Sequence, residues 1–83
     1  MSEERNVDDI LSAADDSVSL INGVDAGSWE VSGMEQSEIN DMVQRNVDHL
    51  NIVLAYEEVV ADSRDKSSYT GAASTGEAYI AAN

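Results

Sequence analysis

The chain has 83 residues, of which 17 are Asp or Glu and 4 are Lys or Arg, and its formal net charge at pH 7 is -13. A chain of this length forms one small domain, whose single core supplies only about 3–5 kcal/mol of stability. The absence of Cys excludes disulfides and thiolate zinc sites. Strong acidity disfavours direct binding to nucleic acid and to an anionic membrane, because both carry negative charge.

The acidic composition leaves two interpretations open. Such a surface attracts a basic partner and speeds their encounter, or it only keeps the protein soluble. The first residues, MSEERN, are polar and are predicted to form a flexible arm over residues 1–6. No run of 18 apolar residues occurs, so neither a signal peptide nor a membrane span is expected.

The first helix is predicted over residues 7–22, with Asn6 as its N-cap and Asn22-Gly23 as its end. Apolar residues at helical spacing form its inner face, namely Val7, Ile10, Leu11, Ala14, Val18 and Ile21. Four carboxylates form an acidic face on the opposite side, namely Asp8, Asp9, Asp15 and Asp16.

Residues 23–33, GVDAGSWEVSG, carry three glycines and are predicted to form a loop. Trp29 is the only Trp of the chain. It has two interpretations, a lid that closes the end of the helical core and an anchor in a protein interface, where Trp is enriched.

The second helix is predicted to begin near Met34 to Ser37, where Ser37 is a candidate N-cap, and to run to about Tyr56. Its apolar stripe consists of Ile39, Met42, Val43, Val47, Leu50, Val53 and Leu54. Asn46 interrupts the middle of this stripe, where a polar side chain satisfies a loop carbonyl or fixes the register of two packed helices. Glu57 would fall within the stripe, so the helix is predicted to bend or restart near Tyr56 to Glu58.

A short helical piece over residues 57–61 would allow both Val59 and Val60 to reach the core. Residues 62–68, DSRDKSS, form a polar linker in which Ser67 or Ser68 caps a last helix at about residues 69–82. The inner face of that helix is made of mostly small residues, and we expect it to dock on the second helix. Gly71 and Gly76 each weaken this helix by roughly 1 kcal/mol relative to Ala.

Part of the chain resembles a group of small phage and prophage proteins. The matching residues run from Gln44 to Leu50, continue at Leu54-Ala55, Arg64-Asp65 and Tyr69, and end in Gly76-Glu77-Ala78-Tyr79-Ile80. In that group a helix reading RNVEHLxxML precedes a polar RD turn and a helix ending GxAYV or GxAYI. This chain departs from the pattern at residues 56–59 and 67–69, where the group has prolines.

The resemblance implies a viral origin and a location in the virion or the host cytoplasm. A small phage protein of this kind is typically a virion accessory protein or a modifier of a host factor. The expected partner is therefore another phage protein or a second copy of this chain.

No motif for catalysis, metal or cofactor binding is recognisable in the sequence. His49 is the only His, and its neighbour Asp48 points about 100° away on a helix, so the two do not form an acid–base pair. His49 is interpreted as a flank residue of the apolar stripe or as an interface residue. The acidic segments do not match a calcium-binding loop, and neither a phosphate-binding loop nor a GxSxG elbow occurs. No cofactor and no small-molecule substrate is expected.

Several apolar residues do not fit a simple helical hairpin, namely Leu20, Trp29, Ile52 and one of Val59 and Val60. Together with low intrinsic stability they favour a partner or self-assembly interface. The side chains predicted to bind the partner are Trp29, His49, Ile52, Tyr56 and Tyr79. We predict one all-α domain over residues 1–83, a helical hairpin of two amphipathic helices with a short C-terminal helix docked on the second.

The leading functional hypothesis is a non-enzymatic phage structural or accessory protein that acts through protein–protein contacts in the virion. The alternative is a small acidic inhibitor or DNA mimic that binds a basic host or defence protein through Asp8, Asp9, Asp15 and Asp16.

Overall fold

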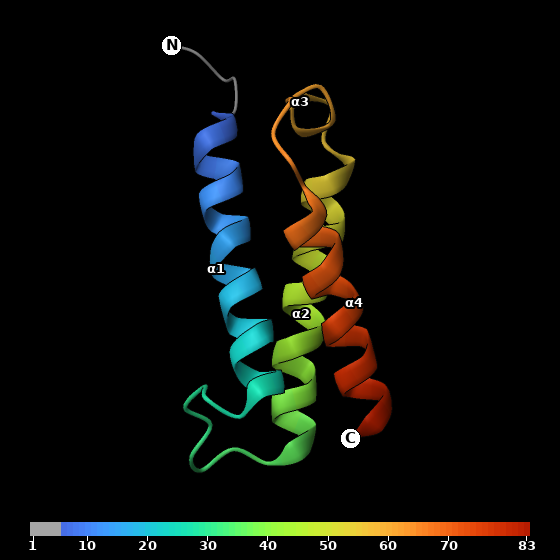
Figure 1. The fold of residues 1–83 in the computed structure, drawn as a ribbon. Coiled ribbons are helices and arrows are strands. Elements are labelled where there is room, and N and C mark those ends of the chain that lie inside the picture. Colours follow the sequence, from blue (N-terminus) through green and yellow to red (C-terminus); the bar gives the residue numbers. More distant parts are fainter. Residues whose placement is uncertain (1–5) are drawn as a thin grey trace.

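The computed structural model describes residues 6–83, and all of its regular elements in that range are helices. They are α1 (Val7–Ala26), α2 (Gln36–Ala55), α3 (Glu57–Val60) and α4 (Ser67–Ala82). In Figure 1, α1, α2 and α4 lie side by side, with α2 antiparallel to the other two. The predicted all-α fold is confirmed, including the docking of α4 on α2. Of the arm predicted over residues 1–6, residues 1–5 lie outside the described residues.

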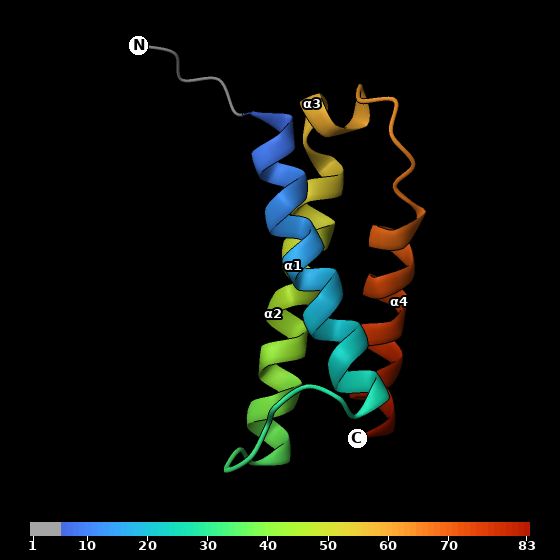
Figure 2. The same cartoon turned by 60° about the vertical axis from the view of Figure 1, so that its left-hand side comes forward.

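Helix α4 contacts α1 as well as α2, so the hairpin is completed to a three-helix bundle. Figure 2 shows the same arrangement from another side, with α3 and the first turn of α1 at one end of the bundle. The 27–35 loop and the C-terminus lie at the opposite end.

The end of α1 differs from the prediction, because the helix continues through Gly23 to Ala26. Val24 extends the apolar stripe by one turn and is buried, which stabilises the additional residues. Gly27 then ends the helix with φ 78°, a left-handed conformation that Gly adopts without steric cost. At the other end the prediction is confirmed, since the Asn6 side chain accepts a hydrogen bond from the Asp8 N–H at 2.8 Å.

Helix α2 starts within the predicted range of Met34 to Ser37, but Ser37 is not its N-cap. Ser37 lies inside the first turn, and Glu35 is the N-cap residue. The Glu38 side chain accepts a hydrogen bond from the Glu35 N–H at 2.8 Å, as in a reciprocal capping box. A carboxylate at this position also interacts favourably with the positive end of the helix dipole.

The predicted break after α2 is confirmed at Tyr56, which has extended backbone angles of φ -67° and ψ 135°. Only one of the two valines that follow reaches the core. Val59 is fully buried, whereas Val60 is 67% exposed. Because α3 is a single turn, it presents one residue to the core, and the prediction that both valines are buried was wrong.

Helix α4 begins at Ser67, two residues before the predicted start, and neither Ser67 nor Ser68 caps it. The Asp65 side chain performs that role, since it accepts a hydrogen bond from the Ser67 N–H at 2.8 Å. This bond lowers the pKa of Asp65. A carboxylate competes well for a free amide at a helix start because the bond is charge-assisted.

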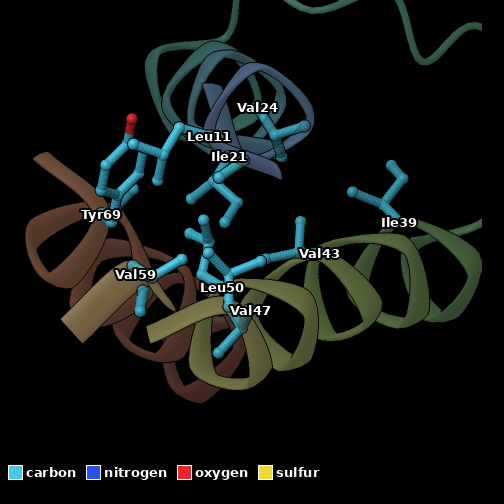
Figure 3. Close-up of a cluster of buried hydrophobic side chains, with 13 residues drawn as sticks. Leu11, Ile21, Val24, Ile39, Val43, Val47, Leu50, Val59 and Tyr69 are labelled. Atoms are coloured by element: carbon cyan, nitrogen blue, oxygen red, sulfur yellow. The ribbon is translucent and has the colours of Figure 1, made fainter. Parts of the chain in front are cut away.

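The core collects side chains from all four helices (Figure 3). Ile21 of α1 points toward α2, while Leu11 of α1 lies beside Tyr69 of α4. The buried apolar residues are Leu11, Ala14, Ile21, Val24, Ile39, Val43, Val47, Leu50, Val53, Val59, Tyr69, Ala72 and Ala73. Small residues of α4 allow its backbone to approach both partner helices closely.

Candidate functional site

Four of the five residues predicted to bind a partner lie toward the two ends of the bundle, whereas His49 lies between them, in contact with Ser17 of α1. Trp29, in the 27–35 loop, and Tyr79, near the end of α4, belong to the end with the C-terminus. The Tyr79 hydroxyl lies 3.0 Å from Nε2 of Gln36, which donates a hydrogen bond to it. Ile52 and Tyr56 lie at the end with α3. The five residues therefore do not form one patch.

Residues 6–83 contain no pocket and no group of three or more His, Asp or Glu placed to hold a metal ion. No helix within this range combines the length and the apolar character needed to cross a membrane.

Trp29 packs on the outer side of α1. A Cβ atom placed on Gly23 would lie 2.9 Å from Cε3 of the indole ring, so the absence of a side chain at Gly23 makes room for the ring. The backbone N–H groups of Ser28 and Trp29 both donate to the Gly23 carbonyl oxygen, at 2.9 and 3.1 Å. The ring is held by these contacts and is still 39% exposed. Whether it anchors a partner stays a prediction.

The contact between Trp29 and Gly23 predicts a specific spectroscopic effect. In G23A the new methyl group displaces the indole, and we expect the emission of this single Trp to shift to longer wavelength as its exposure rises. The far-UV circular dichroism should be unchanged or slightly stronger, because Ala favours the helix by about 1 kcal/mol over Gly. A matched control is G71A, whose Cβ meets no atom within 4 Å. An unchanged emission spectrum in G23A would contradict the contact.

A polar cluster connects α1 with α2 in the middle of the bundle. The Ser17 hydroxyl lies 2.8 Å from Oδ1 of Asn46 and 2.8 Å from Nδ1 of His49. Nδ2 of Asn46 donates to the backbone carbonyl of Met42 at 2.8 Å, which orients its Oδ1 toward Ser17. Asn46 thus connects two helices, which agrees with the second of its two predicted roles, fixing the register of packed helices, and not with the first, satisfying a loop carbonyl.

These contacts assign the proton positions of the cluster. A hydroxyl donates only one hydrogen bond, and Oδ1 of Asn46 is purely an acceptor, so Ser17 donates to Asn46. His49 must then carry a proton on Nδ1 and donate it to Ser17. Ser17 is only 3% exposed, so no substrate reaches its hydroxyl despite the short distance to an imidazole. The hydrogen bonds of this cluster hold α1 against α2.

The sequence analysis missed Ser17, although a signal was present. Ser17 comes three residues after Ala14 and four before Ile21, and it therefore lies within the inner stripe of α1. A Ser at such a position requires a polar partner on the facing helix, and Asn46 was the one polar interruption recognised there. Within residues 6–83 no buried side-chain nitrogen or oxygen lacks a hydrogen-bond partner.

Ile52 and Val60 are the most exposed large apolar side chains, at 54% and 67%. The predicted set of apolar residues that do not fit a hairpin contained Ile52 and one of Val59 and Val60, and the exposure of Ile52 and Val60 agrees with that part of the prediction. Leu20, from the same set, is half-buried, as are Tyr56 and His49. Ile52 lies opposite the core side of α2, since the buried Leu50 and Val53 point about 100–160° away from it.

The four carboxylates of the predicted acidic face have different environments. Asp8 forms an ion pair with Arg64 at 2.8 Å, and Asp15 accepts a hydrogen bond from the Tyr69 hydroxyl at 2.8 Å. Burial raises the pKa of Tyr69, and the bond to Asp15 raises it further. Asp9 and Asp16 are exposed and make no hydrogen bond or ion pair within residues 6–83. Two members of the face therefore connect α1 to the rest of the fold.

Arg64 organises the linker before α4. Its Nε and NH2 groups donate to the two carboxylate oxygens of Asp62, each at 2.9 Å, while NH1 reaches Asp8. Lys66 donates from Nζ to the backbone carbonyls of Asp62 and Arg64. The hydrogen bonds from Arg64 to Asp62 lower the pKa of this carboxyl to about 2. Two of the four basic residues of the chain are thus engaged in internal contacts.

The low pKa of Asp62 predicts how stability changes in acid. A carboxyl with a depressed pKa in the folded state stabilises the fold above its unfolded pKa, about 4, and this contribution is lost as the pH falls toward 2. The melting temperature of D62N should therefore lie below that of the natural chain at pH 5 and converge with it between pH 4 and 2. R64Q should show the same convergence. A constant difference across this range would contradict the interaction.

Comparison of the chain with protein-family models, curated proteins and solved structures finds no match. The structure by itself defines a small acidic three-helix bundle, extended by the single-turn helix α3, with exposed apolar side chains.

Proposed function

We propose that this chain is a non-enzymatic phage structural or accessory protein that acts through protein–protein contacts in the virion. The observation that carries the proposal is the exposure of three large apolar side chains on a bundle of only 83 residues, Trp29, Ile52 and Val60. Exposed apolar groups at both ends of so small a domain favour burial against other proteins. The sequence resemblance to small phage proteins supports the viral setting.

Particle composition and mass in solution test this proposal. Mass spectrometry of purified virions should detect the chain at a constant copy number per particle, and size-exclusion chromatography with light scattering should show a complex or an oligomer. I52S and V60S should weaken incorporation without loss of helix content, because both side chains lie outside the core. A strictly monomeric protein that is absent from purified virions would refute the proposal.

The second candidate is a small acidic inhibitor, or DNA mimic, that binds a basic host or defence protein. It is favoured by the charge distribution, since residues 6–44 contain no Lys or Arg. D9N/D16N is the informative variant, because it removes two charges of the acidic face that have no structural contact within residues 6–83. Binding of such a target should weaken steeply with salt and be lost in this variant. A target whose binding does not weaken as the salt concentration rises would exclude this candidate.

A further inference from the structure

The outer side of α1 combines an exposed aromatic ring with two exposed carboxylates, Asp9 and Asp16, that make no hydrogen bond or ion pair within residues 6–83. Asp9, Asp16 and Gly23 are spaced by seven residues and therefore lie along one line of the helix. Trp29 covers the position of Gly23, so its ring lies at the end of this line. At a rise of 1.5 Å per residue the line is about 21 Å long, with Asp16 about 10 Å from Gly23.

We propose that this surface binds a basic segment of a partner protein, with one Lys or Arg side chain placed against the Trp29 ring. The inference rests on the proposed function, for which it names the chemistry of the partner. Trp is the aromatic side chain that attracts a cation most strongly. No Lys or Arg lies within 15 residues of Trp29 in the sequence, since residues 6–44 contain neither.

Charge complementarity favours a basic segment over three other possible binding partners, namely a second copy of the chain, nucleic acid and anionic lipid. A second copy of the chain would place Asp9 and Asp16 against like charges, on a molecule whose net charge is -13. Nucleic acid and anionic lipid are repelled for the same reason. Trp29 is also held in place before binding, because two backbone hydrogen bonds fix its loop to the Gly23 carbonyl, and less conformational entropy is lost on binding.

The test is an NMR titration of the full chain with a synthetic peptide of alternating Gly and Arg. About eight residues suffice, because an extended chain covers about 21 Å in six or seven residues. A peptide with Gln in place of Arg is the neutral control. We expect shifts confined to the outer side of α1 and the 27–35 loop, a change in Trp29 fluorescence, and weaker binding at higher salt.

Variants separate this surface from the acidity of the whole molecule. W29L keeps an apolar side chain but removes the π system, and it should weaken binding by about 2-fold to 5-fold. D9N/D16N should weaken it by about 2-fold to 10-fold at low salt. D48N/E77Q removes the same charge from α2 and α4, and it should bind as the natural chain does.

Several results would overturn the inference. These are shifts spread evenly over all carboxylates, an affinity that W29L leaves unchanged, or an equal loss in D48N/E77Q. If the chain were found to dimerise through the outer side of α1, the partner at this surface would be a second copy of the chain and not a basic segment. Failure of the peptide to bind a chain that is present in virions would refute only this inference. Binding as expected by a chain absent from virions would refute only the virion role.

Discussion

G76A should destabilise the protein, although Ala is the better helix former. Gly76 lies where α4 crosses the other two long helices, and an added Cβ would collide with Cγ2 of Val47. It would also lie 3.2 Å from Cγ1 of Val43 and 3.3 Å from Cγ2 of Ile21. All three neighbours are at most 1% exposed, so none has free space into which it can move. A helical Val is also restricted to one main rotamer.

The expected size of the effect follows from two opposing contributions. Overpacking a close-packed core costs about 1–3 kcal/mol, whereas replacing Gly by Ala inside a helix returns up to about 1 kcal/mol. We expect a net loss of about 1–2 kcal/mol, which lowers the melting temperature by about 5–15 °C in a domain of this size. Urea unfolding followed by circular dichroism measures the change in free energy, and thermal unfolding measures the change in melting temperature.

Two variants distinguish this packing effect from a general effect of Ala in α4. Gly71 lies on the same helix with no atom within 4 Å of an added Cβ, so G71A should stabilise the protein by about 0.5–1 kcal/mol. V47A removes the methyl group that collides, so G76A should cost less in the V47A background than in the natural chain. If G76A is as stable as G71A, α4 is not packed against Val47.

Gly76 illustrates what the sequence pattern can and cannot predict. Hydrophobic periodicity predicted α1, α2 and α4 and the break at Tyr56, because these depend on spacing within one segment. From the sequence, Gly76 was expected only to weaken its own helix relative to Ala. Its role depends on Val47 and Ile21, which are 29 and 55 residues away in the chain, and no local rule identifies that contact. The sequence therefore predicted the fold correctly, but it did not predict that the close packing of α4 requires Gly at position 76.

Helix boundaries were predicted less well than helix faces, for a related reason. Asn22-Gly23 is a common helix end, but the buried Val24 stabilises one more turn, and Gly27 then ends α1. The exposure of Ile52 could be predicted, because it lies outside the apolar stripe of its helix, whereas the sequence left open whether Trp29 closes the core or is exposed. The position of Trp29 over Gly23 could not be predicted, since it depends on the path of the loop.

Loss of one side chain from the cluster of Ser17, Asn46 and His49 should lower the stability of the fold. In S17A, Oδ1 of Asn46 and Nδ1 of His49 both lose a partner in the half-buried seam between α1 and α2. Leaving such groups unpaired costs about 1–3 kcal/mol, more than the bond itself contributes. S19A changes an exposed Ser of the same helix, and it should alter stability by less than about 0.5 kcal/mol. Urea unfolding of both variants measures the difference.

A double-mutant cycle and an NMR measurement test the cluster independently of the absolute cost. N46A removes the acceptor, so S17A should cost less in the N46A background, with a coupling of about 0.5–3 kcal/mol. Long-range ¹H–¹⁵N correlation spectra of the natural chain should show His49 protonated on Nδ1, and S17A should remove that preference. Additive costs together with an Nε2-protonated ring would show that the three side chains do not form one network. The single polar interruption of the α2 stripe would then have no role in fixing α1 against α2.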